Sequence, residues 1–561
     1  MSSTLQDSAR IAAKRPMPKN LESIEEKKYY RLRVSTDDCG LELYLSDSLS
    51  VREALDHTEI RVRAACGGLG TCGACLIQVI SGRFNPPTPA ERQKLLPDQL
   101  VQGYRLACQL RTLSDGEAYL AHPAPPSQWR SPDRCEWPTV EFSKDIDEVR
   151  QPYGIAVDLG TTHIRLSIWN RHTARLIGCR VGINPQVAHG ADVLTRLDSR
   201  RLDVHASRDL MIEGRKAILD GIRDILSRDF GEVVHVLDET GKIIIVGNTV
   251  MLMLIGGGND SDDLYRLENW HIPVECRIDD IAAWRHDWRM PHADISIAQP
   301  LAGFVGSDLL ADLLASGITE QPVPMLLADL GTNTEIALWD GTAAWVTSVP
   351  GGPAFEGVGM RNGMAAETGA VYRVRDDGDR WLIATIGDQP IRGYCASGFI
   401  DAIAVMLDKQ ILKPSGRFTQ SLQPSGTGYR LDVDNARSAI FGSDVDIFQR
   451  AKASTAAAMM QLLGFADLKP SDLQAVWICG SLGQHLDLHN AIRVGLLPRL
   501  PVDRFKRFAN ASLAGCEQLL LDRNANTRLN TIISKTKSIN LGGISSYEES
   551  FIEHLRLQPM A

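Results

Sequence analysis

The sequence predicts a multidomain protein in which a small α+β domain precedes a larger α/β domain built of two lobes. The chain has 561 residues, too many for a single hydrophobic core, because domains average about 150 residues. Three of its 11 cysteines crowd into residues 66–75. An apolar strand that runs into Asp-Leu-Gly-Thr occurs at 155–161 and again at 326–332, and such a repeat indicates a duplicated unit.

Composition excludes several classes of function. Hydrophobic residues make up 44% of the chain and charged residues 23%, which is typical of a globular protein. The net charge of −9 and the lack of a basic cluster argue against nucleic acid as a partner. No apolar run reaches the roughly 18 residues of a membrane span, and the first residues lack the apolar stretch of a secretory signal. We therefore expect a cytoplasmic protein with no membrane partner, beginning with a disordered tail over residues 1–27.

The first domain is expected at residues 28–122. Two runs of alternating apolar and polar residues, 29–36 and 41–45, flank a turn at 37–40 and predict a β-hairpin. Ser50 and Glu53 form a capping box for a short helix. Thr88 and Glu91 form a second one, with Pro89 at the first helical position.

The cysteines of this domain have the pattern of an iron–sulfur ligand set. Cys66, Cys72 and Cys75 are spaced C-x5-C-x2-C, and Cys108 follows 33 residues later. A [2Fe–2S] cluster requires four thiolates, and the small residues between these cysteines let the backbone approach its sulfides. Zinc is the alternative, but zinc sites usually pair two C-x2-C knuckles and only one is present. The spacing therefore favours a [2Fe–2S] cluster.

Residues 28–122 resemble the ferredoxin domain with a β-grasp fold, and the C-x5-C-x2-C spacing is similar to the adrenodoxin and putidaredoxin type. The segment 123–152 that follows is rich in proline and is expected to be a semi-rigid linker. It would let the cluster domain swing, or else it packs flat against a neighbour.

The second part, residues 153–530, carries the repeated loops and divides into lobes at about 153–322 and 323–530. Glycine in each turn lets a phosphate come close, backbone N–H and hydroxyl groups grip its oxygens, and the aspartate can hold hydrated Mg²⁺. Asp158 and Asp329 are the predicted magnesium-site carboxylates. The predicted phosphate-binding residues are Gly160, Thr161, Thr162, Gly331, Thr332 and Asn333. A third strand ends in Gly-Ser-Leu-Gly, and Gly480, Ser481 and Gly483 are predicted to face adenosine.

The two loops and the glycine-rich strand end together resemble the superfamily of acetate kinase, sugar kinases, heat-shock protein 70 and actin. This resemblance implies a two-lobed, actin-like ATPase domain that binds ATP and Mg²⁺. Asp308 opens an apolar helix, where it could polarise water for ATP hydrolysis. The same position suits any aspartate that interacts with a helix N-terminus, and the two interpretations remain equal.

A series of further motifs extends the resemblance over about residues 28–525. They are Asn-Pro-Gln at 184–186, Gly-Ala-Asp-Val at 190–193, Val-Gly-Asn-Thr at 246–249, Gly-Phe-Val-Gly-Ser-Asp at 303–308 and Gly-Pro-Ala-Phe-Glu-Gly at 352–357. With the ferredoxin-like domain in front, the chain resembles the ATP-dependent reductive activators of corrinoid-dependent methyltransferases. The resemblance implies that the cluster reduces Co(II) to Co(I) in a partner corrinoid protein, and that an upstream electron donor recharges the cluster.

Departures from this family leave alternatives open. We expect the chain to lack the extra middle domain that such activators carry between linker and nucleotide domain, and residues 531–561 to form a C-terminal tail. One alternative is an ATP-coupled electron activator of another low-potential metalloenzyme. Others are a small-molecule kinase with a fused ferredoxin sensor, and a plain electron carrier whose kinase-like half only scaffolds.

Overall fold

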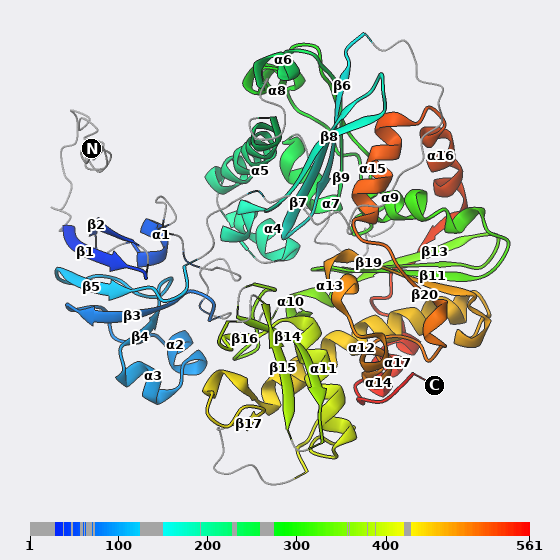
Figure 1. Cartoon of the computed structure of the whole chain (residues 1–561). Coiled ribbons are helices and arrows are strands. Elements are labelled where there is room, and N and C mark those ends of the chain that lie inside the picture. Colours follow the sequence, from blue (N-terminus) through cyan, green and yellow to red (C-terminus); the bar gives the residue numbers. More distant parts are fainter. Residues whose placement is uncertain are drawn as a thin grey trace, which may run out of the picture.

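The computed structural model describes residues 29–37, 39–46, 49–55, 60, 62, 70, 73–123, 129, 150–190, 192–202, 204–226, 233–257, 274–355, 357, 359–367, 369–378, 380–386, 389–419 and 428–560. Figure 1 shows a small domain, in blue, beside two larger lobes. The predicted fold class is confirmed. The expected tail at 1–27 and most of the linker at 123–152 lie outside the described residues.

The small domain is a five-stranded mixed sheet with short helices. Its strands are β1 (Tyr29–Ser35), β2 (Gly40–Ser46), β3 (Leu76–Ser81), β4 (Tyr104–Leu106) and β5 (Gly116–Tyr119), in the order β2-β1-β5-β3-β4. The helices are α1 (Val51–Leu55), α2 (Pro89–Lys94) and α3 (Pro97–Val101). The β1–β2 pair is the predicted hairpin, and β1 runs parallel to β5. Thr88 and Glu91 form the predicted capping box of α2.

The first lobe has a five-stranded sheet ordered β10-β9-β6-β7-β8. The strands are β6 (Tyr153–Leu159), β7 (His163–Asn170), β8 (Arg175–Ile183), β9 (Thr240–Gly247) and β10 (Asp294–Ile297). The helices are α4 (Val193–Leu202), α5 (Val204–Ile225), α6 (Val233–Asp238), α7 (Thr249–Gly256), α8 (Ile281–Trp288) and α9 (Ser307–Ser316). The strands β6 and β9 are almost wholly buried, as expected for a sheet covered on both faces.

The second lobe repeats this arrangement in a six-stranded sheet ordered β20-β19-β11-β12-β13-β21. Its strands are β11 (Met325–Leu330), β12 (Thr334–Trp339), β13 (Ala344–Val349), β19 (Ala475–Cys479), β20 (Phe505–Arg507) and β21 (Thr536–Ser538). The main helices are α10 (Gly352–Phe355), α11 (Ala396–Asp408), α12 (Gly442–Phe465), α13 (Gly480–His485), α14 (Leu488–Val494), α15 (Ala511–Leu521), α16 (Ala525–Lys535) and α17 (Ser545–His554). Smaller sheets are formed by β14 (Ala370–Asp376), β15 (Trp381–Thr385) and β16 (Gly393–Tyr394), and by β17 (Tyr429–Arg430) and β18 (Ala439–Ile440).

The two large sheets share one topology, which explains the repeated motif. In the first lobe, β6 pairs antiparallel with β7 and parallel with β9. In the second, β11 pairs antiparallel with β12 and parallel with β19. Each Asp-Leu-Gly-Thr turn therefore joins the first two strands of its sheet. The turns occupy equivalent places because the strand order is equivalent.

The segment after residue 530, expected to be a tail, is part of the second lobe. Helix α16 continues to Lys535, β21 pairs with β13, and α17 packs on α12. The Nζ of the buried Lys452 in α12 donates to the carbonyl oxygen of Arg556 at 2.7 Å, so the chain end closes over this helix. The interactions join residues about 100 positions apart, which local sequence patterns do not reveal.

One described residue of the linker is anchored in the first lobe. Trp129 is buried in the core of that lobe, and its indole lies where side chains at Gly182 and Gly221 would otherwise be. This position of the linker therefore packs against its neighbour.

Candidate functional site

Two of the predicted cluster ligands lie side by side in the small domain. Cys75 directly precedes β3, Cys108 follows β4, and both side chains are buried. Their Sγ atoms are 3.4 Å apart, too far for a disulfide of about 2.05 Å. Two thiolates on one tetrahedral metal, at bonds of about 2.3 Å, would be separated by roughly 3.8 Å. The pair therefore fits two ligands of the same iron. Cys66 and Cys72 lie outside the described residues.

A buried ion pair holds the strand that delivers Cys108. Arg105 in β4 donates from Nε and Nη2 to the two carboxylate oxygens of Glu91, both at 2.9 Å, and the backbone N–H of Leu106 donates to the same carboxylate. Burial raises the pKa of Glu91, but the hydrogen bonds from Arg105 and from the backbone outweigh it and lower the pKa overall. A buried, bidentate pair of this kind fixes β4 and hence the position of Cys108.

The two predicted phosphate loops meet between the lobes. The hydroxyl groups of Thr162 and Thr332 are 2.8 Å apart and hydrogen bond to each other. Each loop is closed by a backbone hydrogen bond from its glycine: the N–H of Gly160 donates to the carbonyl of His163, three residues on, and the N–H of Gly331 donates to the carbonyl of Asn333, two residues on. The tertiary structure therefore brings together the two loops that the sequence placed 171 residues apart.

The predicted carboxylates form a buried acidic cluster at these loops. Burial raises the pKa of Asp158 to about 6; Arg165, 3.2 Å away, opposes the shift and Asp329 adds to it. Burial also raises the pKa of Asp308 to about 7, with further increases from Asp158 and Asp329. Among the described residues, no three His, Cys, Asp or Glu side chains are placed to hold a metal ion directly. So many buried carboxylates with little compensating positive charge therefore favour a cation that keeps its water ligands.

Two members of the cluster had no role assigned from the sequence. Asp312 lies one helical turn after Asp308 in α9, and Glu335 follows the second loop in β12. Burial raises the pKa of both groups well above the usual range, and Asp329 and Asp308 raise it further. Asp312 could have been identified from its four-residue spacing from Asp308, because residues four positions apart share one face of a helix. No local signal separates Glu335 from other strand acids.

The third predicted loop reaches the same cluster. Gly480 directly follows β19 and begins α13 in a left-handed conformation with φ +79°, and a Cβ there would collide with the carboxylate of Asp329. Glycine is therefore required for the close approach of this strand end to the second phosphate loop. Gly483 lies one turn further in α13 and packs on Ile478. Ser481 is the second residue of the same helix.

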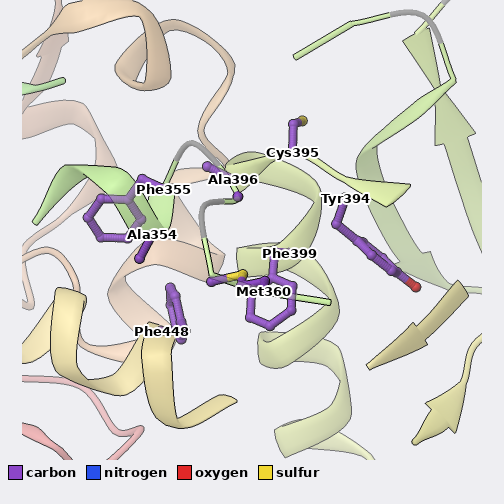
Figure 2. A pocket seen from close by; sticks show the side chains of 9 residues that line it. Ala354, Phe355, Met360, Tyr394, Cys395, Ala396, Phe399 and Phe448 are labelled. Carbon is purple, nitrogen blue, oxygen red and sulfur yellow. The ribbon is translucent and has the colours of Figure 1, made fainter. Parts of the chain in front are cut away.

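A separate apolar pocket lies in the second lobe. Figure 2 shows the rings of Phe355, Phe399 and Phe448 around the side chain of Met360, while the hydroxyl of Tyr394 points away. That hydroxyl donates to the carbonyl of Ser438 at 2.7 Å. The lining residues include no charged side chain, so this pocket is distinct from the acidic site and does not fit phosphate.

The cluster domain contacts both lobes. Lys94 at the end of α2 donates from Nζ to the carbonyl of Gly359, next to Met360, and Arg52 in α1 donates to the carbonyl of Ala188. A Cβ at Gly73, in the cysteine loop, would lie 2.8 Å from Cε of Lys94. The cysteine loop and the second lobe therefore meet across one lysine side chain.

Among the described residues, no helix combines the length and the apolar character needed to cross a membrane.

Three family models cover most of the chain. Residues 38–112 match the 2Fe-2S iron-sulfur cluster binding domain, residues 153–321 the RACo middle region, and residues 323–561 the C-terminal domain of RACo, the ASKHA domain. The expectation that a middle domain is absent was therefore wrong. Residues 153–321 form the first lobe, which has the same sheet topology as the second lobe. Their repeated motif therefore indicated half of a nucleotide-binding domain and no separate middle region.

Two characterised proteins are similar over most of their length. The corrinoid activation enzyme RamQ of Eubacterium limosum is 26% identical over 443 residues, which is 74% of this chain and 72% of RamQ. The [Co(II) methylated amine-specific corrinoid protein] reductase of Methanosarcina barkeri is 25% identical over 416 residues, 69% of this chain and 73% of that protein.

A solved structure shows the same fold. The reductive activator for corrinoid,iron-sulfur protein superposes with a TM-score of 0.61 at 22% identity, covering 94% of this chain and 98% of that one. The match includes the cluster domain as well as both lobes. The chain therefore belongs to the family of corrinoid reductive activators, in which a 2Fe-2S domain precedes the RACo middle region and the ASKHA domain.

Proposed function

We propose that this protein is an ATP-dependent reductive activator that returns a corrinoid protein from Co(II) to Co(I) by transfer of one electron. One observation carries this function: a thiolate pair spaced for iron and a pair of joined phosphate loops occur in one chain. The names of the two relatives, which are a corrinoid activation enzyme and a corrinoid protein reductase, support the same activity. The partner is a corrinoid protein of a methyltransferase system.

The small domain is the electron-delivering end. Cys66, Cys72, Cys75 and Cys108 would hold the [2Fe–2S] cluster, which supplies single electrons when bound. The cluster would supply the one electron that converts Co(II) to Co(I) in the partner, and an upstream one-electron donor would have to reduce it again. Gln109 donates from Nε2 to Sγ of Cys108 at 3.7 Å, and hydrogen bonds to ligand sulfur raise the potential of such centres.

The two lobes are the ATP-binding end. Gly160, Thr161, Thr162, Gly331, Thr332 and Asn333 would bind the phosphates, and Gly480, Ser481 and Gly483 the adenosine. Asp158 and Asp329 would bind hydrated Mg²⁺, and Asp308 would accept a proton from the water that attacks the γ-phosphate. Because these groups come from both lobes, bound ATP stabilises the arrangement that closes them around it. A ligand shifts an equilibrium only by its different affinity for the two states.

An anaerobic titration tests this function. Purified protein is mixed with reductant, ATP and a candidate corrinoid protein, and the visible spectrum is followed. We expect Co(I) absorbance only when this protein and ATP are both present. Equal Co(I) formation without ATP would contradict ATP coupling. ATP turnover stimulated by a small-molecule acceptor, and not by a corrinoid protein, would favour a kinase.

A further inference from the structure

One motif of the first lobe, Val-Gly-Asn-Thr at residues 246–249, has no part in the site described so far. It begins at the end of β9, which runs parallel to β6 with Gly247 paired to Leu159. A Cβ at Gly247 would lie 2.6 Å from the carbonyl oxygen of Leu159. The next residue after β6 is Gly160 of the first predicted phosphate loop, and the next after β9 is Asn248. Both therefore lie at the carboxyl edge of the sheet, where open α/β sheets bind ligands.

The side-chain amide of Asn248 uses only one of its two ends. The side chain is 3% exposed, and its Oδ1 accepts from the N–H of Val250 at 3.0 Å, which caps helix α7. Among the described residues, no group accepts a hydrogen bond from the buried Nδ2. Turning the amide over would place Nδ2 against the N–H of Val250, with two donors facing each other. The cap therefore fixes the orientation of the amide and leaves Nδ2 for another acceptor.

Asparagine is a costly choice for a helix cap alone at this buried position. Serine and aspartate cap a helix about as well as asparagine, and neither brings an amide donor. A buried donor without an acceptor has lost its hydrogen bonds to water and gained nothing in return. Capping of α7 therefore explains Oδ1 of Asn248, whereas Nδ2 is suited to an acceptor that a ligand brings.

Asn248 also lies against the segment that carries Asp308. A Cβ at Gly306 would be 2.7 Å from Cα of Asn248 and would collide with Oδ1 of Asp308. Gly306 has a φ of −76°, which any residue can adopt, so the close approach is what excludes a side chain there. The hydroxyl oxygen of Ser307 accepts from the N–H of Gly247 at 3.2 Å and holds the two segments together. Asn248 therefore adjoins both the first predicted phosphate loop and Asp308.

The chemistry of the site selects the acceptor for Nδ2. A water bound to Mg²⁺ directs its lone pairs at the metal and its hydrogens outward, so it does not accept from an amide. A phosphate oxygen does accept, and the N-terminus of α7 beside Asn248 also favours negative charge. Of the phosphates of ATP, the γ-phosphate is the one that lies next to the water on which Asp308 would act.

We propose that Asn248 is a further nucleotide-binding residue, whose Nδ2 donates to an oxygen of the γ-phosphate beside Asp308. This inference rests on the ATP site of the proposed function and adds how that site distinguishes ATP from ADP. Because ADP lacks the γ-phosphate, only ATP supplies the acceptor for the Asn248 amide. The hydrogen bond between Ser307 and Gly247 keeps this phosphate contact in a fixed relation to Asp308.

The test is calorimetric titration of the full-length protein, in the presence of Mg²⁺, with ADP and with the non-hydrolysable β,γ-imido analogue of ATP. Asn248→Ser keeps an oxygen that caps α7 and removes the amide donor. We expect this variant to bind the ATP analogue about tenfold more weakly, and to bind ADP with an affinity within about twofold of the unmodified protein. Its melting temperature without nucleotide should not fall, because the cap is kept and an unpaired buried donor is removed.

A second substitution and a matched control complete the test. Asn248→Asp keeps the volume and the cap but places a carboxylate against the γ-phosphate, so it should weaken binding of the ATP analogue about 100-fold or more, and more than serine does. The control is Asn435→Ser in the second lobe. Asn435 caps the short helix Ala436–Ser438 through Oδ1, and its Nδ2 already donates to the carbonyl of Ile391. This variant should leave both affinities unchanged.

Two outcomes would overturn the inference and leave the ATP site of the proposed function intact. One is an unchanged affinity of Asn248→Ser for the ATP analogue. The other is an equal loss of affinity for the analogue and for ADP, which would place Asn248 at a part that the two nucleotides share. If the serine variant does not fold, Asn248→Asp decides by the same comparison. Failure of the unmodified protein to bind the ATP analogue would contradict the proposed function, and this inference with it.

Discussion

The Nζ atom of Lys94 lies 3.0 Å from the carbonyl oxygen of Gly359 and so joins the cluster domain to the second lobe. The same side chain covers Gly73 in the cysteine loop, and its charge lowers the pKa of the buried Asp444 beside Arg361, against the larger effect of burial. An electron carrier that serves a separate partner has to expose its cluster loop. The Lys94 contact is thus one bond that a swinging cluster domain would have to break.

Lys94→Ala should loosen this contact. The lost hydrogen bond contributes about 1 kcal/mol, enough to change the docked fraction several-fold. We expect a larger radius of gyration in small-angle X-ray scattering. Arg92→Ala, on the same helix but exposed, is the control and should leave the radius unchanged. An unchanged radius in the Lys94 variant would mean that other contacts hold the domain.

Cys75→Ser and Cys108→Ser should each remove most of the bound iron and the visible absorption of the cluster. The reason is that both sulfurs fit the same metal and serine oxygen is a poor replacement for thiolate. Iron content and the absorption spectrum of anaerobically purified protein measure this. The control is Cys39→Ser, at an exposed turn before β2, which should keep both the bound iron and the visible absorption. Full retention of iron in either ligand variant would contradict the assignment.

Asp308→Asn should separate hydrolysis from binding. If Asp308 accepts the proton of the attacking water, ATP turnover should fall about 100-fold while ATP affinity changes less than about threefold. Steady-state assays measure the ATP turnover, and calorimetric titration measures the ATP affinity. An unchanged ATP turnover would mean that Asp308 only stabilises the N-terminus of α9.

Glu517→Gln should alter the pH dependence of stability. Burial raises the pKa of Glu517 from 4.5 to about 8, so between these values the folded protein holds a proton that the unfolded chain has lost. The contribution of Glu517 is fully present below pH 4.5. It falls by about 1.4 kcal/mol per pH unit until about pH 8, where the folded group also ionises.

Denaturant unfolding at pH 5 and pH 8 measures the effect. Glutamine can accept the same bonds from Ser167 and Trp169 and does not ionise, so the variant should lose less stability on going to pH 8. Glu117→Gln, on an exposed strand position, serves as the control. A pH dependence identical to that of the unmodified protein would show that Glu517 does not titrate in this range.

Local patterns allowed several elements of this protein to be predicted. The capping box of Thr88 and Glu91, the hairpin of β1 and β2 and the Gly160 and Gly331 turns involve residues within a few positions of each other. Such interactions are encoded by neighbouring side chains and backbone preferences. The repeated turn also predicted two equivalent lobes, because each turn implies the same strand pair.

The sequence by itself therefore determined the domain order and the positions of the predicted ligand cysteines and of the two predicted phosphate loops. Only the tertiary structure decided that the Thr162 and Thr332 hydroxyl groups meet, that Asp312 and Glu335 join the acidic cluster, and that the last 30 residues complete the second lobe. The physical reason is distance along the chain. Helix α15 reaches Ala311 and Ser167 across 200 to 350 residues, and such contacts depend on how whole sheets and helices pack.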